Sequence, residues 1–209
     1  MCGAGRPLTM SAPSASLTGM TRAIFYTAST LNGFLADPDD SLDWLLTIPQ
    51  EGATADIAAF IDGIGVMVEG SSTYAWVLEH EGLLAHPERW QQFYGARPTY
   101  VFTSRSLPRV PGADVRFVQG SVREHWDDIV AAAGDKDVWI VGGGDLVGQF
   151  ADAGLLEEII VTFAPVTLSS GKPLLPRDLD HSRLELVSVR QAGPFAELTY
   201  RLSPPSERA

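Results

Sequence analysis

Three consecutive glycines, Gly142, Gly143 and Gly144, separate the apolar run VWIV from the amphipathic stretch DLVGQF. A short apolar run followed by helical spacing is typical of a buried strand that leads into a helix. Without Cβ atoms at such a turn, the unpaired N–H groups of the first helical turn stay accessible to an anion. The pattern predicts a phosphate site built from main chain, with a tight turn that binds nothing as the alternative.

The glycine spacing differs from the ordinary dinucleotide fingerprint. Gly142, Gly144 and Gly148 follow G-x-G-x-x-x-G, and they lie two-thirds of the way along the chain. No acidic residue stands about 20 residues later, where the fingerprint expects a ribose ligand. These departures argue against a standard Rossmann domain.

A second candidate helix start follows Gly70, which ends the apolar run IGVMVEG. Ser71, Ser72 and Thr73 come next, and their hydroxyl groups suit either a helix cap or a phosphate donor. Both roles stay open for Ser71 and Ser72.

The composition excludes several other chemistries. The single cysteine, Cys2, and four histidines without an i, i+4 pair provide no metal-site spacing. No G-x-S-x-G motif indicates a serine nucleophile. The formal net charge of −11, without a Lys/Arg cluster, argues against nucleic-acid binding. No apolar run reaches the roughly 18 residues of a membrane-spanning helix, so we expect no membrane partner.

The elements that must position these residues alternate along the chain. Strands are predicted at 22–29, 64–70, 98–104, 115–120, 136–141 and 155–166. Helices are predicted at 41–46, 54–63, 71–80, 87–95, 121–133 and 145–154. Two alternating runs around Ala192-Gly193-Pro194 predict a hairpin within residues 184–202. The alternation predicts an α/β sandwich with a mostly parallel sheet and an antiparallel edge.

The N-terminal segment has a different composition from the rest of the chain. Residues 1–20 are rich in Gly, Pro and Ser and lack the apolar core of a secretory signal. We expect a flexible extension over 1–20, one domain over 21–205 and a cytoplasmic protein.

Five stretches, taken in order, resemble the dihydrofolate reductase superfamily: STLNGFLADPDDSLDWL, MVEGSSTYAWV, VFTSRSLP, VGGGDLVGQF and LLEEIIVTFAPVTLSSGKPLLP. Together they cover most of residues 22–176, and they are most similar to the C-terminal reductase domain of the bacterial bifunctional riboflavin-biosynthesis deaminase-reductase. The resemblance implies a dihydrofolate reductase-like three-layer α/β/α sandwich, an NADPH cofactor and a homodimer.

The resemblance also implies where the cofactor binds. The pyrophosphate is expected on the glycines and on the N–H groups of the next three residues, with a cis bond between Gly142 and Gly143. The cofactor residues implied are Ala28, Gly70, Ser71, Ser72, Thr73, Thr103, Ser104, Arg105, Gly142, Gly143, Gly144, Asp145, Leu146 and Val147.

Three residues depart from the family pattern. Ser71 stands where the family usually has Arg, so Arg105 becomes the candidate for the 2′-phosphate. Asn32 replaces a common Asp and cannot ionise. Asp145 takes a position that is Arg in some relatives, and we expect its carboxylate to point away from phosphate and favour the helix start.

The resemblance places the substrate near Asn32, Asp43 and Thr162, the candidate catalytic residues, with Trp44 and Lys172 as candidate substrate contacts. A helix-dipole role for Asp43 and a structural role for Thr162 are alternatives. The implied activity is NADPH-dependent hydride transfer to 5-amino-6-(5-phosphoribosylamino)uracil or another small substrate. A non-catalytic nucleotide-binding or regulatory role is the alternative. The zinc signature of the deaminase half is absent from the sequence.

Overall fold

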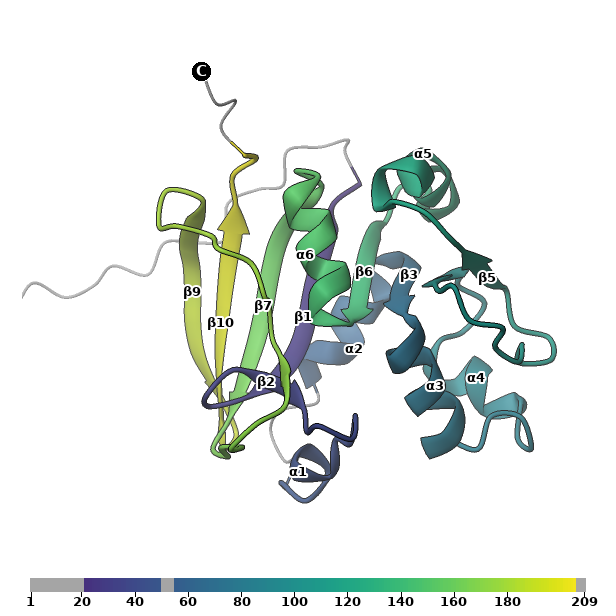
Figure 1. Cartoon of the computed structure of the whole chain (residues 1–209), viewed down its shortest axis with the longest axis horizontal. Helices are drawn as coiled ribbons and strands as arrows, with labels where there is room; N and C mark the ends of the chain where they lie inside the picture. Colours follow the sequence, from purple (N-terminus) through teal and green to yellow (C-terminus); the bar gives the residue numbers. More distant parts are fainter. Residues whose placement is uncertain (1–20, 50–54, 206–209) are drawn as a thin grey trace, which may run out of the picture.

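The computed structural model describes residues 21–49 and 55–205. Its main sheet has eight strands in the order β5-β4-β3-β6-β1-β7-β10-β9 (Figure 1). The strand bounds are β1 Ala23–Thr30, β3 Ile64–Gly70, β4 Thr99–Phe102, β5 Val115–Val118, β6 Asp137–Gly142, β7 Leu156–Ala164, β9 Leu184–Ala192 and β10 Phe195–Leu202. The six strands from β5 to β7 run parallel, and β10 and β9 are antiparallel. The predicted mostly parallel α/β sheet with a C-terminal hairpin is confirmed.

The helices cover the sheet on both faces. Helices α5 (Val122–Ala133) and α6 (Gly144–Asp152) pack on one face. Figure 1 shows α6 in front of the strands and α2 (Ala55–Asp62) behind them, on the other face. The first face buries the larger apolar core, with Phe25 and Phe150 fully enclosed. Helices α3 (Ser71–His80) and α4 (Glu88–Phe93) bury a smaller cluster around Tyr74 and Trp90 on the opposite face.

The central strands are apolar on both faces because helices cover both. On β3, Val66 and Val68 face one side of the sheet and Met67 faces the other, and all three are at most 1% exposed. Such continuous apolar runs are expected for buried parallel strands. This burial fixes the positions of the strand ends, and the chain at the carboxyl ends of β1, β3 and β6 is held accordingly.

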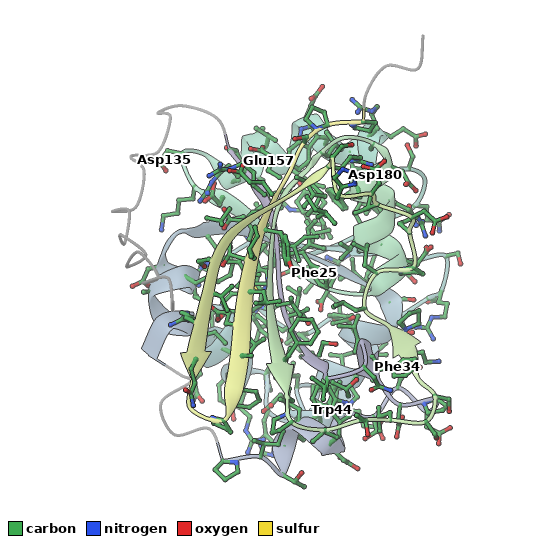
Figure 2. All side chains as sticks on the ribbon, turned by 90° about the vertical axis from the view of Figure 1, so that its left-hand side faces the viewer. Phe25, Phe34, Trp44, Asp135, Glu157 and Asp180 are labelled. Carbon is green, nitrogen blue, oxygen red and sulfur yellow. The ribbon has the colours of Figure 1, made fainter. Side chains whose placement is uncertain are left out.

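Two short connections lie at this end of the sheet. One contains β2 (Phe34–Ala36) and the short helix α1 (Asp43–Leu46), and the other contains β8 (Lys172–Pro173). Strands β2 and β8 pair with each other in a separate two-stranded sheet. Figure 2 shows Phe34 and Trp44 at the same end of the molecule, below Phe25 in the core.

The sequence predicts most elements correctly and misses this small sheet, because strands of two or three residues carry no periodicity. The predicted strand at 155–166 ends at Ala164, immediately before Pro165, which cannot donate to the ladder. Residues 1–20, the predicted flexible extension, lie outside the described residues. Within 21–49 and 55–205, no helix has the length and apolarity needed to cross a membrane.

Candidate functional site

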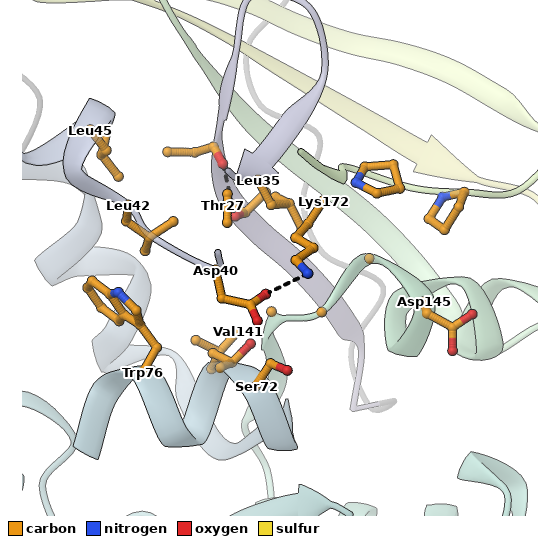
Figure 3. Close-up of a pocket in the computed structure, with 18 residues that line it drawn as sticks. Thr27, Leu35, Asp40, Leu42, Leu45, Ser72, Trp76, Val141, Asp145 and Lys172 are labelled. Atoms are coloured by element: carbon orange, nitrogen blue, oxygen red, sulfur yellow. Dashed lines mark hydrogen bonds and ion pairs between the residues drawn. The ribbon is translucent and has the colours of Figure 1, made fainter. Parts of the chain in front are cut away.

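A cavity of about 360 Å³ opens at the carboxyl ends of β1 and β6, beside the start of α3 (Figure 3). Ligand sites of α/β sheets lie at this edge, and the volume is in the range of small-molecule pockets. Its lining comes from five parts of the chain: Thr27 and Ala28; Leu35, Ala36, Asp40, Leu42 and Leu45; Ser72, Thr73 and Trp76; Val141 to Asp145; and Lys172, Pro173 and Pro176.

The three glycines form one side of this cavity, each for its own steric reason. A Cβ atom on Gly142 would lie 2.9 Å from Thr73 Oγ1. On Gly144 it would lie 2.8 Å from the carbonyl oxygen of Leu174. Gly143 has φ +95°, a conformation that favours glycine. The glycines thus allow α3, α6 and the 173–174 segment to converge on one point.

The expected cis bond between Gly142 and Gly143 is wrong, because the structure has no cis peptide bond in the described residues. The positive φ of Gly143 turns the chain from β6 into α6 with a trans bond.

Two helices begin at the cavity without a side-chain cap. The N-cap of α3 is Gly70 and that of α6 is Gly143, and neither has a side chain to cap its helix. The first N–H groups of each helix therefore lack an intrahelical acceptor and carry partial positive charge. One expected donor is excluded, since Val147 N–H donates to Gly143 O at 3.0 Å within the helix. Leu146 and Val147 direct their side chains into the core.

Asp145 is held away from the cavity by its neighbours. Its carboxylate accepts from Gln149 at 3.0 Å and from Arg177 at 3.0 Å. These hydrogen bonds lower the pKa of Asp145, with Gln149 as the larger cause. The side chain projects away from the centre of the cavity in Figure 3, as the sequence predicts for an acid beside a phosphate site.

An ion pair lies in the cavity. Lys172 Nζ lies 3.4 Å from Asp40 Oδ1 (Figure 3). Asp40 has φ +65°, and it is the one non-glycine residue with positive φ among those described. Asp and Asn are the residues that tolerate this conformation best after glycine.

The wall beyond Asp40 is apolar. Leu42 and Leu45 of the α1 segment face Trp76 of α3. The Trp76 ring stacks on His80 with centroids 4.4 Å apart and planes 11° apart, which fixes the plane of the indole. The cavity therefore has a polar side made of main chain and an apolar side made of aliphatic and aromatic side chains.

The sequence of the chain matches a known family over residues 84–196, the RibD C-terminal domain. The uncharacterized protein YwjB of Bacillus subtilis is 30% identical over 179 residues, which cover 86% of this chain and 97% of YwjB. This chain belongs to the RibD C-terminal domain family.

Solved structures carry the same fold at lower identity. A putative riboflavin biosynthesis protein from Shewanella superposes with a TM-score of 0.69 at 22% identity, covering 88% of this chain and 99% of that one. A diaminohydroxyphosphoribosylaminopyrimidine deaminase/5-amino-6-(5-phosphoribosylamino)uracil reductase from Thermotoga maritima superposes with a TM-score of 0.62 at 16% identity. The match covers 88% of this chain and 57% of the Thermotoga chain.

The structure brings together part of the predicted cofactor set. Ala28, Ser72, Thr73, the three glycines and Asp145 line the cavity, and so does the predicted substrate contact Lys172. Gly70 and Ser71 lie at the start of α3 beside them without lining it.

The residues after β4 lie outside the cavity lining. Thr103 is buried, and its hydroxyl accepts from the Arg105 N–H at 2.9 Å, which closes the turn. Ser104 and Arg105 are exposed at the same carboxyl edge of the sheet. Arg105 forms no ion pair within the described residues, so its guanidinium is available at the surface.

Asn32 has a structural position in this RibD C-terminal domain family member. Its Nδ2 donates to Leu168 O at 2.7 Å, and its Oδ1 accepts from the Thr30 hydroxyl at 3.0 Å. These bonds tie the turn after β1 to the segment after β7. The side chain does not line the cavity.

Asp43 and Trp44 also lie away from the cavity, which α1 approaches with Leu42 and Leu45 instead. Residues three apart share a helix face, and the two between them turn elsewhere. The acids that line the cavity are Asp40 and Asp145, so the structure does not place Asp43 in this lining.

Thr162 belongs to a separate polar cluster on β7. Its hydroxyl donates to Glu197 Oε2 at 3.4 Å, and the same oxygen accepts from Tyr26 at 2.8 Å. Arg190 Nε donates to the other carboxylate oxygen at 2.6 Å. Burial, and then the hydrogen bond to Glu197, raise the pKa of Tyr26 to about 12. The cavity lining does not include this cluster.

Sequence reasoning missed Asp40 and Trp76. Asp40 lies in the turn ADPDDSL, which reads only as a loop, and Trp76 lies in a helix whose exposed face had no distinguishing pattern. Both line the cavity because the turn before α1 and helix α3, which are far apart in the sequence, meet there, and local sequence does not encode that meeting.

Proposed function

We propose that the chain is an NADPH-dependent reductase that transfers hydride to a small heterocyclic, carbonyl or imine substrate. The observation that carries the proposal is the convergence of two uncapped helix starts and a glycine-lined strand end on one cavity. Family membership supports the same activity, since the Thermotoga protein of this fold is described as a reductase. The homodimer stays a prediction.

The residues present fit a dinucleotide phosphate group. Main-chain N–H groups at Gly144 and Asp145 and at the start of α3 would hold the pyrophosphate without basic side chains, as suits an acidic chain. Ser72 is exposed at the cavity and its hydroxyl would add a donor. Arg105, beyond the next strand end, would meet the 2′-phosphate of the cofactor.

The cofactor would supply the hydride, and the protein would supply position and surroundings. Ala28, at the end of β1, has a small side chain that leaves room for a flat ring against the main chain. Leu35, Leu42 and Leu45 would exclude water from the side opposite the glycines. A water molecule or the Lys172 ammonium group is the proton source that this lining offers.

The proposal is tested by titrating the protein with NADPH and NADH while following tryptophan fluorescence, because Trp76 lines the cavity. We expect saturable quenching by NADPH and weaker binding of NADH. Ser72→Asp, which places a negative charge at the phosphate site, should weaken NADPH binding at least tenfold. Ser169→Asp makes the same charge change on an exposed loop residue outside the cavity and should not.

Absence of NADPH binding, or equal affinities in both Ser→Asp variants, contradicts the proposed cofactor site. NADPH binding without oxidation by any pyrimidine or pterin substrate would favour the non-catalytic alternative.

A further inference from the structure

We infer that the substrate of this chain is a flat heterocycle that carries no phosphate group. The inference rests on the proposed function and concerns the part of the cavity around Asp40, Lys172 and Trp76. It separates this chain from the phosphorylated pyrimidine named for the Thermotoga protein.

The charges of the lining oppose a phosphate. Lys172 is the one cation among the described residues that line the cavity, and its ammonium group is already paired with Asp40 at 3.4 Å. A phosphate dianion would have to displace the Asp40 carboxylate, which stays nearby on the same turn, within a chain of net charge −11.

Arg177, which follows the lining residue Pro176, is committed elsewhere. Arg177 donates to Asp152 at 2.7 Å and to Asp145 at 3.0 Å. Its guanidinium lies over Gly148 on α6, where a Cβ would be 2.6 Å from Cζ. Arg177 therefore neutralises the two acids of α6 and adds no free positive charge to the cavity.

The main-chain donors are committed as well under the proposed function. The starts of α3 and α6 would bind the cofactor pyrophosphate, and both lie on the glycine side. The opposite side offers Leu35, Leu42, Leu45 and Trp76. Burying a phosphate against apolar walls without donors is costly, whereas a flat ring would gain by stacking on an indole.

A matched pair of compounds tests the inference on the protein saturated with NADP⁺. The pair is 5-amino-6-(5-phosphoribosylamino)uracil and the same compound without its phosphate, with 7,8-dihydrobiopterin as a second neutral heterocycle. Binding is measured by calorimetry, so the result does not depend on turnover. We expect a neutral compound to bind at least tenfold more tightly than the phosphorylated one.

Two variants connect the preference to the ion pair. Asp40→Asn leaves Lys172 without its counter-ion and should improve the relative affinity for the phosphorylated compound at least fivefold. Asp39→Asn removes the same charge from an exposed neighbour in the same turn and should leave the ratio unchanged.

The outcomes separate the two proposals. Tighter binding of the phosphorylated compound, or no binding of any of the three while NADPH still binds, overturns the inference and leaves the cofactor site intact. An unchanged ratio in Asp40→Asn overturns the role of the ion pair. Failure to bind NADPH overturns the proposed function, and the inference falls with it.

Discussion

The Thr73 side chain packs directly against Gly142. A Cβ atom on that glycine would lie 2.9 Å from Thr73 Oγ1 and 3.2 Å from Cγ2. Thr73 lies in the first turn of α3, and Gly142 ends β6 just before α6 begins. Because the two residues are far apart in sequence, their contact fixes the spacing of the two helix starts at the cavity.

This contact predicts a rescue by a second mutation. Gly142→Ala should lower the free energy of unfolding by about 1–3 kcal/mol through overpacking. In a Thr73→Ala background, which removes both close atoms, the same change should cost less than half as much. Urea unfolding of the four proteins measures the coupling. Additive effects in this cycle would mean that the glycine is required for another reason.

The buried carboxyl group of Glu69 should make the free energy of unfolding depend on pH. It is 1% exposed on β3, its Oε2 has no hydrogen-bond partner among the described residues, and burial raises its pKa to about 8. The unfolded chain releases this proton near the ordinary pKa of 4.5. Between these values only the folded state binds the proton, so stability falls as pH rises, by roughly 1.4 kcal/mol per pH unit.

Glu69→Gln should therefore be more stable than the native chain at pH 8 by on the order of 3 kcal/mol, and nearly equal to it at pH 5. Denaturant unfolding across this range measures the difference. The exposed Glu79→Gln on α3 serves as the control and should show no such trend. A constant difference between Glu69→Gln and the native chain at every pH would refute the assignment.

Under the proposed function, Arg105 should set the preference for NADPH over NADH. Arg105→Ala should weaken NADPH binding about tenfold, the magnitude of one lost charge-assisted hydrogen bond to phosphate, and leave NADH binding nearly unchanged. Fluorescence titration with both cofactors measures this. Arg109→Ala, in the same loop, is the matched control because its guanidinium donates to Val115 O and packs on Phe117. Equal losses for NADPH and NADH in Arg105→Ala would exclude a 2′-phosphate contact.

Substitution of Thr162 should change the stability of the protein without changing its turnover. Its hydroxyl is one of three groups that donate to Glu197, which is 6% exposed. Thr162→Val should cost about 1 kcal/mol of stability and leave kcat and KM unchanged. Thr199→Val makes the same substitution on the adjacent strand β10 and serves as the control. A tenfold rise in KM with unaltered stability would restore Thr162 to the substrate site.

The sequence predicts the fold well because its signals are local. The apolar runs of β3 and β6, the glycine stops and the Ser121 cap, whose hydroxyl accepts from the Glu124 N–H at 3.4 Å, all act within a few residues. The glycine side of the cavity can be predicted for the same reason, because strand ends and helix starts of a parallel sheet meet at one edge.

The opposite side of the cavity could not be predicted in the same way. Whether Asp40 or Asp43 faces a ligand depends on the path of the turn before α1 and on the orientation of that four-residue helix. Lys172 meets Asp40 only because β2 and β8, elements of three and two residues, pair across a long separation. Neither feature has a propensity signal strong enough to read from the residues alone.

The two-stranded sheet of β2 and β8 is separate from the eight-stranded sheet. The connections that contain it, residues 31–46 and 165–177, contribute no strand to the main sheet, yet they carry Asp40, Leu42, Leu45 and Lys172. Grafting this pair of connections from one relative onto another would exchange these four cavity side chains while the three glycines and the starts of α3 and α6 stayed the same.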